Sequence, residues 1–440
     1  MMASITVREY ARLTTDVIGD DTLDRARISI SAFDWLCRLS AGFSRSGASL
    51  VEIEDRRWLR LDNYVGVVET PCGTRIEILP KHIGDGDDAK TSRTLLKRMI
   101  LAALELSPRQ AGPASLDRFD SPITEWMVGR FLGALDYLVK RGLRSDYVRV
   151  SSAEHYLRGQ LDVARQARQP PGREHLFQIR HDIFFPDGPE NRLLKAALEQ
   201  VSRATKSAAH WQLASELRAL LHDVPTSGNI NDDFKRWRGD RLMAHYRPVL
   251  PLCELILHSQ MPLALAGEWQ GISMLFPMEK LFEAYVTGAL RSELADGAQL
   301  HPQTTRASLC SHLGTRMFQL KPDMFVTREA SCWVLDAKWK LLDQGDRLAK
   351  YQLNQADFYQ LFAYGHKYMA GRGEMFLVYP LTSSFTNALP VFEFGDGLCL
   401  RVIPFDLEAR RFIGLEQTNF PLKPSSAAPE CFGHHDPLCG

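Results

Sequence analysis

The 440-residue chain lacks the Gly-x-x-x-x-Gly-Lys-Ser/Thr loop of nucleotide hydrolases. Because that loop cradles the phosphates of a nucleotide, its absence predicts that the chain itself binds and hydrolyses no nucleotide. The sequence also has no internal repeat, no apolar run of membrane length and no apolar signal core in its first ten residues. We therefore expect a globular, cytoplasmic protein that contacts no membrane.

An excess of positive charge is missing as well. Lysine and arginine total 53, and aspartate and glutamate also total 53, so no net field attracts nucleic acid to the whole chain. A local excess lies between residues 139 and 180, where nine basic residues face four acidic ones. One interpretation is that this stretch binds phosphates or an acidic partner surface. The other is that it forms an ordinary solvated face. Both interpretations remain open.

Cysteine is sparse, with eight residues scattered along the chain, several inside apolar runs. This pattern favours reduced buried thiols over a disulfide framework. The tail at residues 421–440 is the exception, because Cys431, His434, His435 and Cys439 are zinc-ligand types. They follow a Pro-Ser-Ser-Ala-Ala-Pro stretch with few apolar neighbours, which favours a disordered end.

The remaining composition predicts two or three domains, because 45% hydrophobic residues suffice for sizeable cores. Short alternating strands are expected at residues 28–33, 51–53 and 75–79, and helices at 93–106, 123–138, 191–221 and 234–258. We divide the chain into a β-rich N-terminal domain at 1–165, a helical connecting region at 166–265, a C-terminal domain at 266–420 and the tail. Packing at a helix start, rather than ligand binding, is the favoured role of Asp182, Asn191, Arg192 and Lys195.

A β-hairpin carries the most informative residues. Residues 317–327 are expected to form a strand, 328–331 a polar four-residue turn and 332–341 the returning strand. A turn centred between residues 329 and 330 places Asp323 directly opposite Asp336.

Lys338 shares a face with Asp336, because side chains alternate along a strand. Two acids opposite each other among apolar neighbours repel, and a divalent cation removes that conflict. Mg²⁺ uses one or two carboxylates and keeps positions open for water and phosphate oxygens; Mn²⁺ is expected to substitute. The backbone carbonyl of Ala337 could add a ligand, while Lys338 orients a hydrolytic water or stabilises negative charge on a phosphate.

The arrangement Pro322-Asp323, twelve residues, then Asp336-Ala337-Lys338 resembles the PD-(D/E)xK signature of metal-dependent nucleases. The alternative is an exposed hairpin with scattered charges. The surroundings favour the nuclease interpretation, since an apolar helical pattern precedes the hairpin, a second amphipathic segment follows at residues 354–364, and a buried strand is expected at 374–379.

The two flanking segments contribute further candidate residues. The first carries Glu279 and Glu283 one helical turn apart, and the resemblance implies that one of them supplies an additional acidic ligand. The second carries Gln360 and Tyr364 at i,i+4 spacing, similar to the Gln-x-x-x-Tyr element of RecB-like nucleases.

Segments over most of the chain resemble the McrC family, the nuclease subunits of McrBC-type modification-dependent restriction systems. The similar stretches, in shared order, are residues 64–68, 70–74, 76–81, 141–143, 157–161, 182, 191–195 and 278–283. The last reads Met-Glu-Lys-Leu-Phe-Glu, which favours Glu283 over Glu279.

The resemblance implies a mixed α/β (α+β) protein with a C-terminal PD-(D/E)xK core, a β-rich N-terminal domain and a helical middle region. It implies a Mg²⁺-dependent DNA endonuclease in which Asp323, Asp336 and Glu283 hold the metal and Lys338 assists the attacking water. Gln360 and Tyr364 would support the site or position the DNA backbone.

The resemblance also implies partners: double-stranded DNA and a McrB-like ring-forming GTPase or other NTPase, on which the N-terminal half docks and which it stimulates. Neutral overall charge agrees with DNA delivered by such a partner. Two alternatives remain open, a non-catalytic scaffold that activates an NTPase and a stand-alone repair-type nuclease. An intact Asp, Asp and Lys set disfavours the scaffold, and the long N-terminal half disfavours the stand-alone enzyme.

Overall fold

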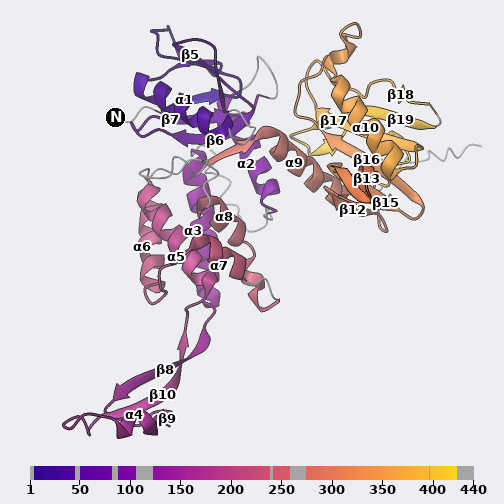
Figure 1. Ribbon diagram of the computed structural model, residues 1–440. Coiled ribbons are helices and arrows are strands. Elements are labelled where there is room, and N and C mark those ends of the chain that lie inside the picture. Colours follow the sequence, from indigo (N-terminus) through magenta and orange to yellow (C-terminus); the bar gives the residue numbers. More distant parts are fainter. Residues whose placement is uncertain are drawn as a thin grey trace, which may run out of the picture. The chain divides into compact units, whose positions relative to one another are not determined.

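The computed structural model describes residues 4–44, 50–81, 88–105, 122–237, 241–257, 274–395 and 397–423 (Figure 1). The chain forms two compact units. The first unit comprises Met1–Asp62, Gly66–Ile78 and Ala111–Leu275, and the second comprises Asn63–Val65, Leu79–Gln110 and Phe276–Gly440. The mixed α/β class expected from the sequence is confirmed. In the described part of the chain, no helix combines the length and apolarity needed to cross a bilayer.

Two small sheets carry the N-terminal part of the chain. One has the order β3 (Arg25–Arg27), β2 (Arg12–Thr14), β5 (Trp58–Leu61) and β4 (Val51–Ile53). The other has the order β1 (Ser4–Arg8), β7 (Arg75–Leu79), β6 (Tyr64–Glu69) and β11 (Met274–Pro277). The strands expected at residues 51–53 and 75–79 are thus confirmed.

The strand expected at residues 28–33 is wrong, because helix α1 (Ile30–Ser44) begins inside it. Its buried side chains Phe33, Leu36 and Leu39 recur at helical spacing, whereas Ile30 is exposed. The short alternation of apolar residues at 28–33 is therefore part of a longer pattern with helical spacing, and the helix forms.

The helix expected at residues 123–138 is confirmed as α3 (Ile123–Arg141), whereas the two long helices expected after it are divided into shorter ones. The shorter elements are α5 (Pro189–Ala204), α6 (Ala208–Leu220), α7 (Ile230–Arg236), the turn η3 (Arg241–Tyr246) and α8 (Leu250–Leu257). The single helices expected at 191–221 and 234–258 are wrong. Extended Thr205 ends α5, and the hydroxyl of Ser207 caps α6 by accepting from the His210 N–H.

Polar residues at the start of α5 make contacts inside the first unit. Asn191 is buried, donates to the carbonyls of Arg144 and Pro186, and accepts from the Tyr246 hydroxyl at 2.7 Å. Arg192 pairs with Asp187 at 3.1 Å. Lys195 donates to backbone carbonyls of residues 222 and 224, and Asp182 pairs with an arginine of the neighbouring strand. These contacts agree with the structural roles expected for them.

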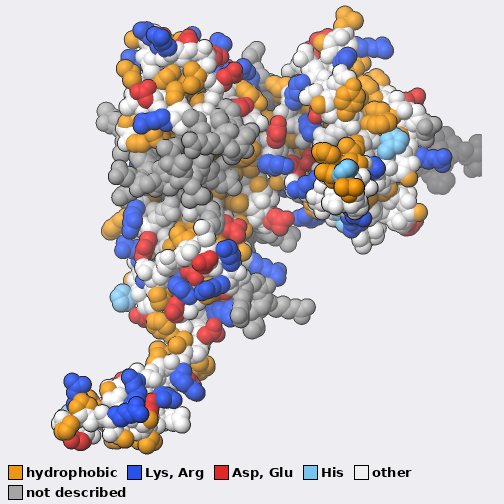
Figure 2. All heavy atoms as spheres, in the orientation of Figure 1, with side chains coloured by type: hydrophobic (Ala, Val, Ile, Leu, Met, Phe, Trp, Pro, Cys, Tyr) orange, Lys and Arg blue, Asp and Glu red, His pale blue; other side chains and the backbone are white. Residues whose placement is uncertain are grey.

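Most of the basic stretch lies in a projection, which we call the arm (residues 146–185). Strands β8 (Asp146–Glu154) and β10 (Phe177–Phe185) pair antiparallel over their whole length, and β9 (Gln160–Leu161) and helix α4 (Val163–Ala167) lie at the far end (Figure 1). Figure 2 shows basic and apolar side chains mixed over its surface. Tyr147 and Phe184 are 77% and 64% exposed, with ring centroids 5.2 Å apart.

The second unit is built on a seven-stranded mixed sheet. Its order is β12 (Gln299–Pro302), β15 (Met324–Arg328), β16 (Ser331–Ala337), β17 (Gly373–Pro380), β19 (Leu398–Asp406) and β18 (Phe392–Glu393), with β20 (Arg411–Phe412) also on β19. β16, β17 and β19 run parallel, and helix α10 (Gln355–Tyr368) lies in the crossover from β16 to β17. The buried strand expected at 374–379 is confirmed as β17.

Helices pack on both faces of this sheet. Leu361 and Tyr364 of α10 share a core with Val334, Leu377 and Val402. On the other face, helix α9 (Met278–Glu293) places Phe282 and Tyr285 against Phe405. Val402 and Phe405 are an odd number of residues apart, so they point to opposite faces. Helix α2 (Ala89–Ala103) packs on α9.

The hairpin has the expected register, with Met324 opposite Leu335 and Arg328 opposite Ser331. Three details of the expectation are wrong. The connection has two residues, 329 and 330, rather than four, and the returning strand ends at Ala337 rather than at residue 341. The strand expected at 317–327 is divided, because β14 (Thr315–Leu320) pairs instead with β13 (Ala307–His312) in a separate two-stranded sheet. Pro322 has no N–H for a ladder, which explains the break.

Candidate active site

The two aspartates lie at the end of the hairpin where the strands diverge. Asp323 immediately precedes β15, so continuation of the register past Met324 and Leu335 places it opposite Asp336. The Ala337 N–H donates to Asp323 Oδ2 at 2.9 Å, and this bond fixes the Asp323 carboxylate against the end of β16. Asp336 is 1% exposed.

Burial, with a smaller contribution from neighbouring carboxylates, holds the pKa of both carboxyl groups above its usual range. Burial and the charges of Asp336 and Glu283 raise the pKa of Asp323 to about 8, although the Ala337 N–H and Lys338 act in the opposite direction. Burial also raises the pKa of Asp336, and Lys338 offsets only part of this rise. Additional positive charge at this pair would therefore favour the ionised carboxylates.

Lys338 is the cation nearest to this pair. Its Nζ lies 2.9 Å from Asp336 Oδ2 and 3.8 Å from Asp357 Oδ1, and it donates to Gln360 Oε1 at 3.4 Å. Burial lowers the pKa of Lys338, but the charges of the surrounding aspartates outweigh that effect and raise the pKa overall. The side chain is thus a protonated ammonium that is 27% exposed and within reach of a ligand.

Glu283 enters from α9 and is 7% exposed, whereas Glu279 is exposed. Its carboxylate accepts from Lys280 Nζ at 2.6 Å and from the side-chain amide of Gln303. The Gln303 N–H donates to the Asp323 carbonyl at 2.9 Å, so one residue ties Glu283 to the turn that carries Asp323. This placement agrees with the preference for Glu283 over Glu279.

Gln360 and Tyr364 lie on the side of α10 that faces the hairpin. Gln360 Nε2 donates to the Tyr364 hydroxyl at 2.6 Å, and that hydroxyl donates to the Lys321 carbonyl at 3.0 Å. A continuous path therefore runs from Lys338 through both side chains to the bend before Asp323. This geometry favours positioning of Lys338 and the bend as their role.

Three further residues belong to the site, namely Lys280, Gln303 and Asp357. Lys280 could have been found, because it lies three residues before Glu283 on one helix. Asp357 lies three residues before Gln360 and accepts from the Tyr379 hydroxyl at 3.4 Å. Gln303 gave no sequence signal, since its position depends on a left-handed backbone with φ of 45°.

The oxygen atoms of the site match the donors that a hard divalent cation prefers. Asp336 Oδ2 is buried and accepts no hydrogen bond of normal geometry from the described residues, and burial raises the pKa of both aspartates. Among the described residues, no three His, Cys, Asp or Glu side chains already converge as metal ligands. Lys280 and Lys338 contact Glu283 and Asp336, so a cation would have to replace these amines as the partner of the carboxylates.

Comparison with solved structures identifies similar folds. A refined half-complex from a tetradecameric assembly of Thermococcus gammatolerans McrB AAA+ hexamers with bound McrC contains a chain with a TM-score of 0.66 and 20% identity, covering 92% of this chain and 95% of that one. The cryo-EM structure of the Thermococcus gammatolerans McrBC complex matches with a TM-score of 0.50 and 21% identity, covering 66% and 87%. At these identities the likeness shows the fold alone.

Comparison with curated protein sequences gives no match. A family model described as McrBC 5-methylcytosine restriction system component matches residues 59–380. This range covers well over half of the sequence, including the hairpin and both flanking helices. The chain therefore belongs to the family of McrBC 5-methylcytosine restriction system components.

Proposed function

We propose that the chain is a Mg²⁺-dependent DNA endonuclease subunit that cleaves modified DNA delivered by a partner NTPase ring and stimulates that NTPase. The observation that carries this proposal is the convergence of Asp323, Asp336 and Lys338 at one end of a hairpin, within a family of restriction components. Strongly shifted pKa values cluster at functional sites, and two acids beside a protonated lysine supply groups that could bind a cation and a phosphate.

In this proposal Asp323, Asp336 and Glu283 hold Mg²⁺, or Mn²⁺ in its place, and the Ala337 carbonyl adds a ligand. The bound cation would lower the pKa of a water molecule and stabilise negative charge on the phosphate. Lys338 remains protonated, so it donates a hydrogen bond to the attacking water or to a phosphate oxygen. Gln360 accepts from Lys338 and orients its amine.

The partner is proposed to be a McrB-like ring-forming GTPase or another NTPase. The similar Thermococcus gammatolerans McrC is bound to McrB AAA+ hexamers, and this sequence has no phosphate-binding loop of its own. The N-terminal half is proposed to dock on the ring. Within it, the arm offers exposed aromatic rings together with exposed arginines, a combination that suits a protein contact. A cytoplasmic location agrees with the free thiols of the described cysteines.

The experiment that tests this function is purification of the chain with its co-expressed NTPase, followed by cleavage assays on methylated and unmethylated DNA. We expect cleavage that requires Mg²⁺ and a nucleoside triphosphate. Stimulated NTPase activity without cleavage in Mg²⁺ or Mn²⁺ would favour the scaffold alternative. Cleavage by the chain alone would favour the stand-alone nuclease.

The raised pKa of Asp323 predicts how stability depends on pH. The carboxyl group titrates near 8 in the folded chain and at about 3.9 when unfolded. The folded state retains a proton that the unfolded state releases, so this group's stabilisation is complete below about pH 4 and is lost as pH rises toward 8. In EDTA we therefore expect the Tm of the wild type to fall relative to that of Asp323→Asn between pH 5 and pH 8.

Mg²⁺ should raise the Tm more at pH 8 than at pH 6, because it binds the ionised carboxylates. Differential scanning fluorimetry measures both effects. Asp296→Asn is the matched control, since Asp296 is exposed in the same unit. A wild-type Tm that rises with pH relative to Asp323→Asn would contradict this assignment.

Tyr364→Phe tests whether Tyr364 positions the neighbouring site residues. The change removes the hydrogen bonds to Gln360 and to the Lys321 carbonyl, so we expect a loss of about 1 kcal/mol in the free energy of unfolding. Cleavage should fall by about tenfold, because Asp323 follows the bend that the tyrosine holds. Urea unfolding and single-turnover cleavage measure the two effects. Tyr359→Phe is the control, since Tyr359 is exposed on the same helix; equal effects from both changes would refute the role of Tyr364.

A further inference from the structure

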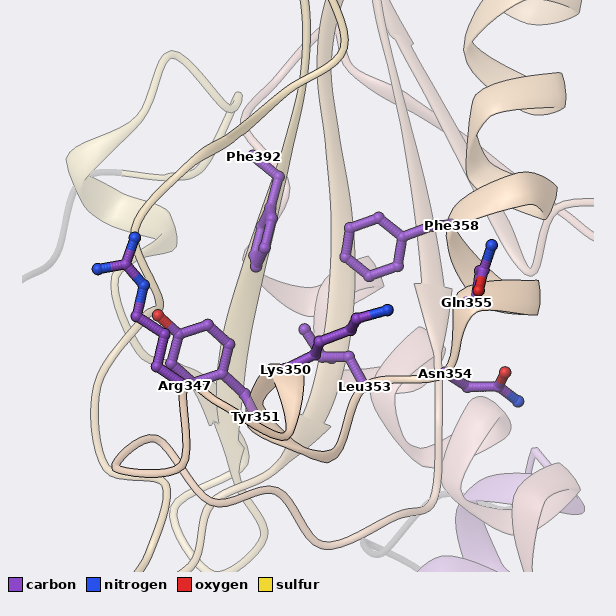
Figure 3. Close-up of a pocket in the computed structure, with 8 residues that line it drawn as sticks. All are labelled: Arg347, Lys350, Tyr351, Leu353, Asn354, Gln355, Phe358 and Phe392. Atoms are coloured by element: carbon purple, nitrogen blue, oxygen red, sulfur yellow. The ribbon is translucent and has the colours of Figure 1, made fainter.

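A cavity lies in the same unit as the candidate active site. It has a volume of about 360 Å³ and is formed by the turn η5 (Lys350–Gln352), the start of α10 and strand β18 (Figure 3). Volumes of roughly 300 to 1,000 Å³ are typical of small-molecule sites. The cavity is large enough for a flat heterocyclic ring.

Its walls are aromatic. Phe358 and Phe392 have ring centroids 5.1 Å apart at an interplanar angle of 82°, and Tyr351 lies 6.4 Å from Phe392 at 84°. All three side chains are half-buried, and Figure 3 shows them together with the other residues that line the cavity. Rings that contact each other edge to face keep other surfaces available for an aromatic guest.

Positive charge borders these walls. Arg347 and Lys350 line the same cavity, and both are exposed. Aromatic rings that stack a base, next to cations that contact the backbone, are the combination by which proteins bind single-stranded nucleic acid. The charge and the apolar walls thus complement the two halves of a nucleotide.

The backbone of the turn is held in an unusual conformation. Lys350, Tyr351 and Gln352 have consecutive φ values of 55°, 59° and 67°, a left-handed region that side chains other than glycine rarely adopt. The Tyr351 N–H donates to the Asp346 carbonyl at 2.7 Å, and Lys340 Nζ donates to the Gln352 carbonyl. Conformations of this kind persist where the surroundings fix them, and they cluster at binding sites. Contacts with Asp346 and Lys340 therefore hold the turn that forms one wall of the cavity.

The cavity and the candidate active site share two chain segments. Phe358 directly follows Asp357, whose carboxylate lies 3.8 Å from Lys338 Nζ. Lys340, which anchors the turn, comes two residues after Lys338. The first turn of α10 and the segment after β16 therefore contribute both to the candidate active site and to the surroundings of the cavity.

We propose that this cavity binds an unpaired nucleobase of the DNA substrate, with Arg347 and Lys350 on adjacent phosphates. The base is unpaired because a ring inside a duplex cannot reach enclosing aromatic walls. This inference rests on the proposed function and adds to it that one nucleotide of the substrate leaves the base stack.

The test measures binding without cleavage. The full chain with Asp336→Asn is titrated with a short thymidine oligonucleotide that carries one 2-aminopurine, and fluorescence reports stacking of that base. We expect quenching, and binding at least about fivefold weaker when the 2-aminopurine is replaced by an abasic nucleotide. Phe358→Leu should reduce both the quenching and the affinity. Phe362→Leu, one turn further along α10 and not part of the cavity wall, should change neither.

Arg347→Ala supplies a second variant whose exposed position does not endanger folding. It should lower the slope of log affinity against log salt concentration by about one, as expected for one phosphate contact. Arg328→Ala is the matched control, since Arg328 is exposed at the tip of the hairpin, away from the aspartates.

Affinity that is the same for the base and the abasic nucleotide, or is unchanged by Phe358→Leu, overturns the proposal. If Phe358→Leu instead weakens binding of the partner NTPase and leaves DNA binding unchanged, the cavity binds a protein side chain. That result also overturns the proposal. Either result with intact cleavage by the wild-type complex leaves the nuclease assignment standing. If the wild-type complex binds the base but cleaves no DNA, the base-binding proposal is supported and the nuclease assignment is rejected.

Discussion

Asp336→Asn is expected to lower DNA cleavage by the complex by about a thousandfold or more, while the folded chain stays at least as stable as the wild type. The change keeps the shape of the side chain but removes a charge that the proposed Mg²⁺ site requires. Asp336 is buried with a raised pKa, so its ionised form weakens the fold in the absence of metal. Loss of function should therefore not reflect unfolding.

Single-turnover cleavage is measured on the complex, and the Tm in EDTA is measured on the chain alone. Asp296→Asn serves as control, because it removes an exposed carboxylate from the same unit and should affect neither quantity. Cleavage within about tenfold of the wild type would eliminate Asp336 as a metal ligand.

Lys338→Met has the second largest expected effect, because it removes activity and stability together. The ammonium lies 2.9 Å from a carboxylate that is 1% exposed, and removal of one partner leaves the other charge buried without compensation. Such a loss costs about 3 kcal/mol in the free energy of unfolding at pH 8. Cleavage should be abolished, since no other described side chain delivers a cation to Asp336 at this distance.

The double variant Lys338→Met with Asp336→Asn should recover most of the lost stability, because it removes both charges of the pair. Urea unfolding in EDTA completes this double-mutant cycle. Lys367→Met is the control for loss of an exposed lysine from the same unit. Additive effects of the two single changes would show that the pair is not coupled in the folded chain.

The hairpin register was predictable because it depends on two local signals. The turn segment at residues 328–331 fixed the turn centre, and alternation then placed Asp323, Asp336 and Lys338 on one face. The helix that carries Glu283 was predictable from its apolar spacing after Pro277. Both features depend only on residues that are close in sequence, so the sequence pattern was sufficient to predict them.

The features that were missed depend on contacts between distant segments. Nothing near Met317 shows that its strand leaves the main sheet to pair with β13, except the proline at 322. Gln303 reaches Glu283 only because its own backbone is left-handed. Breaks at Thr205 and after Arg236 were hidden because apolar residues on both sides continue the helical spacing.

The arm has an energetic consequence for any assembly that uses it. Along most of its length only two strands pair, since β9 adds a third strand over two residues, and an isolated two-stranded ribbon is marginally stable in water. Its amides should exchange with deuterated solvent far sooner than those of the helices to which it is joined. A partner that binds the arm must also restrict its internal motion. Complex formation should therefore carry an unfavourable entropy change, and its affinity should depend markedly on temperature.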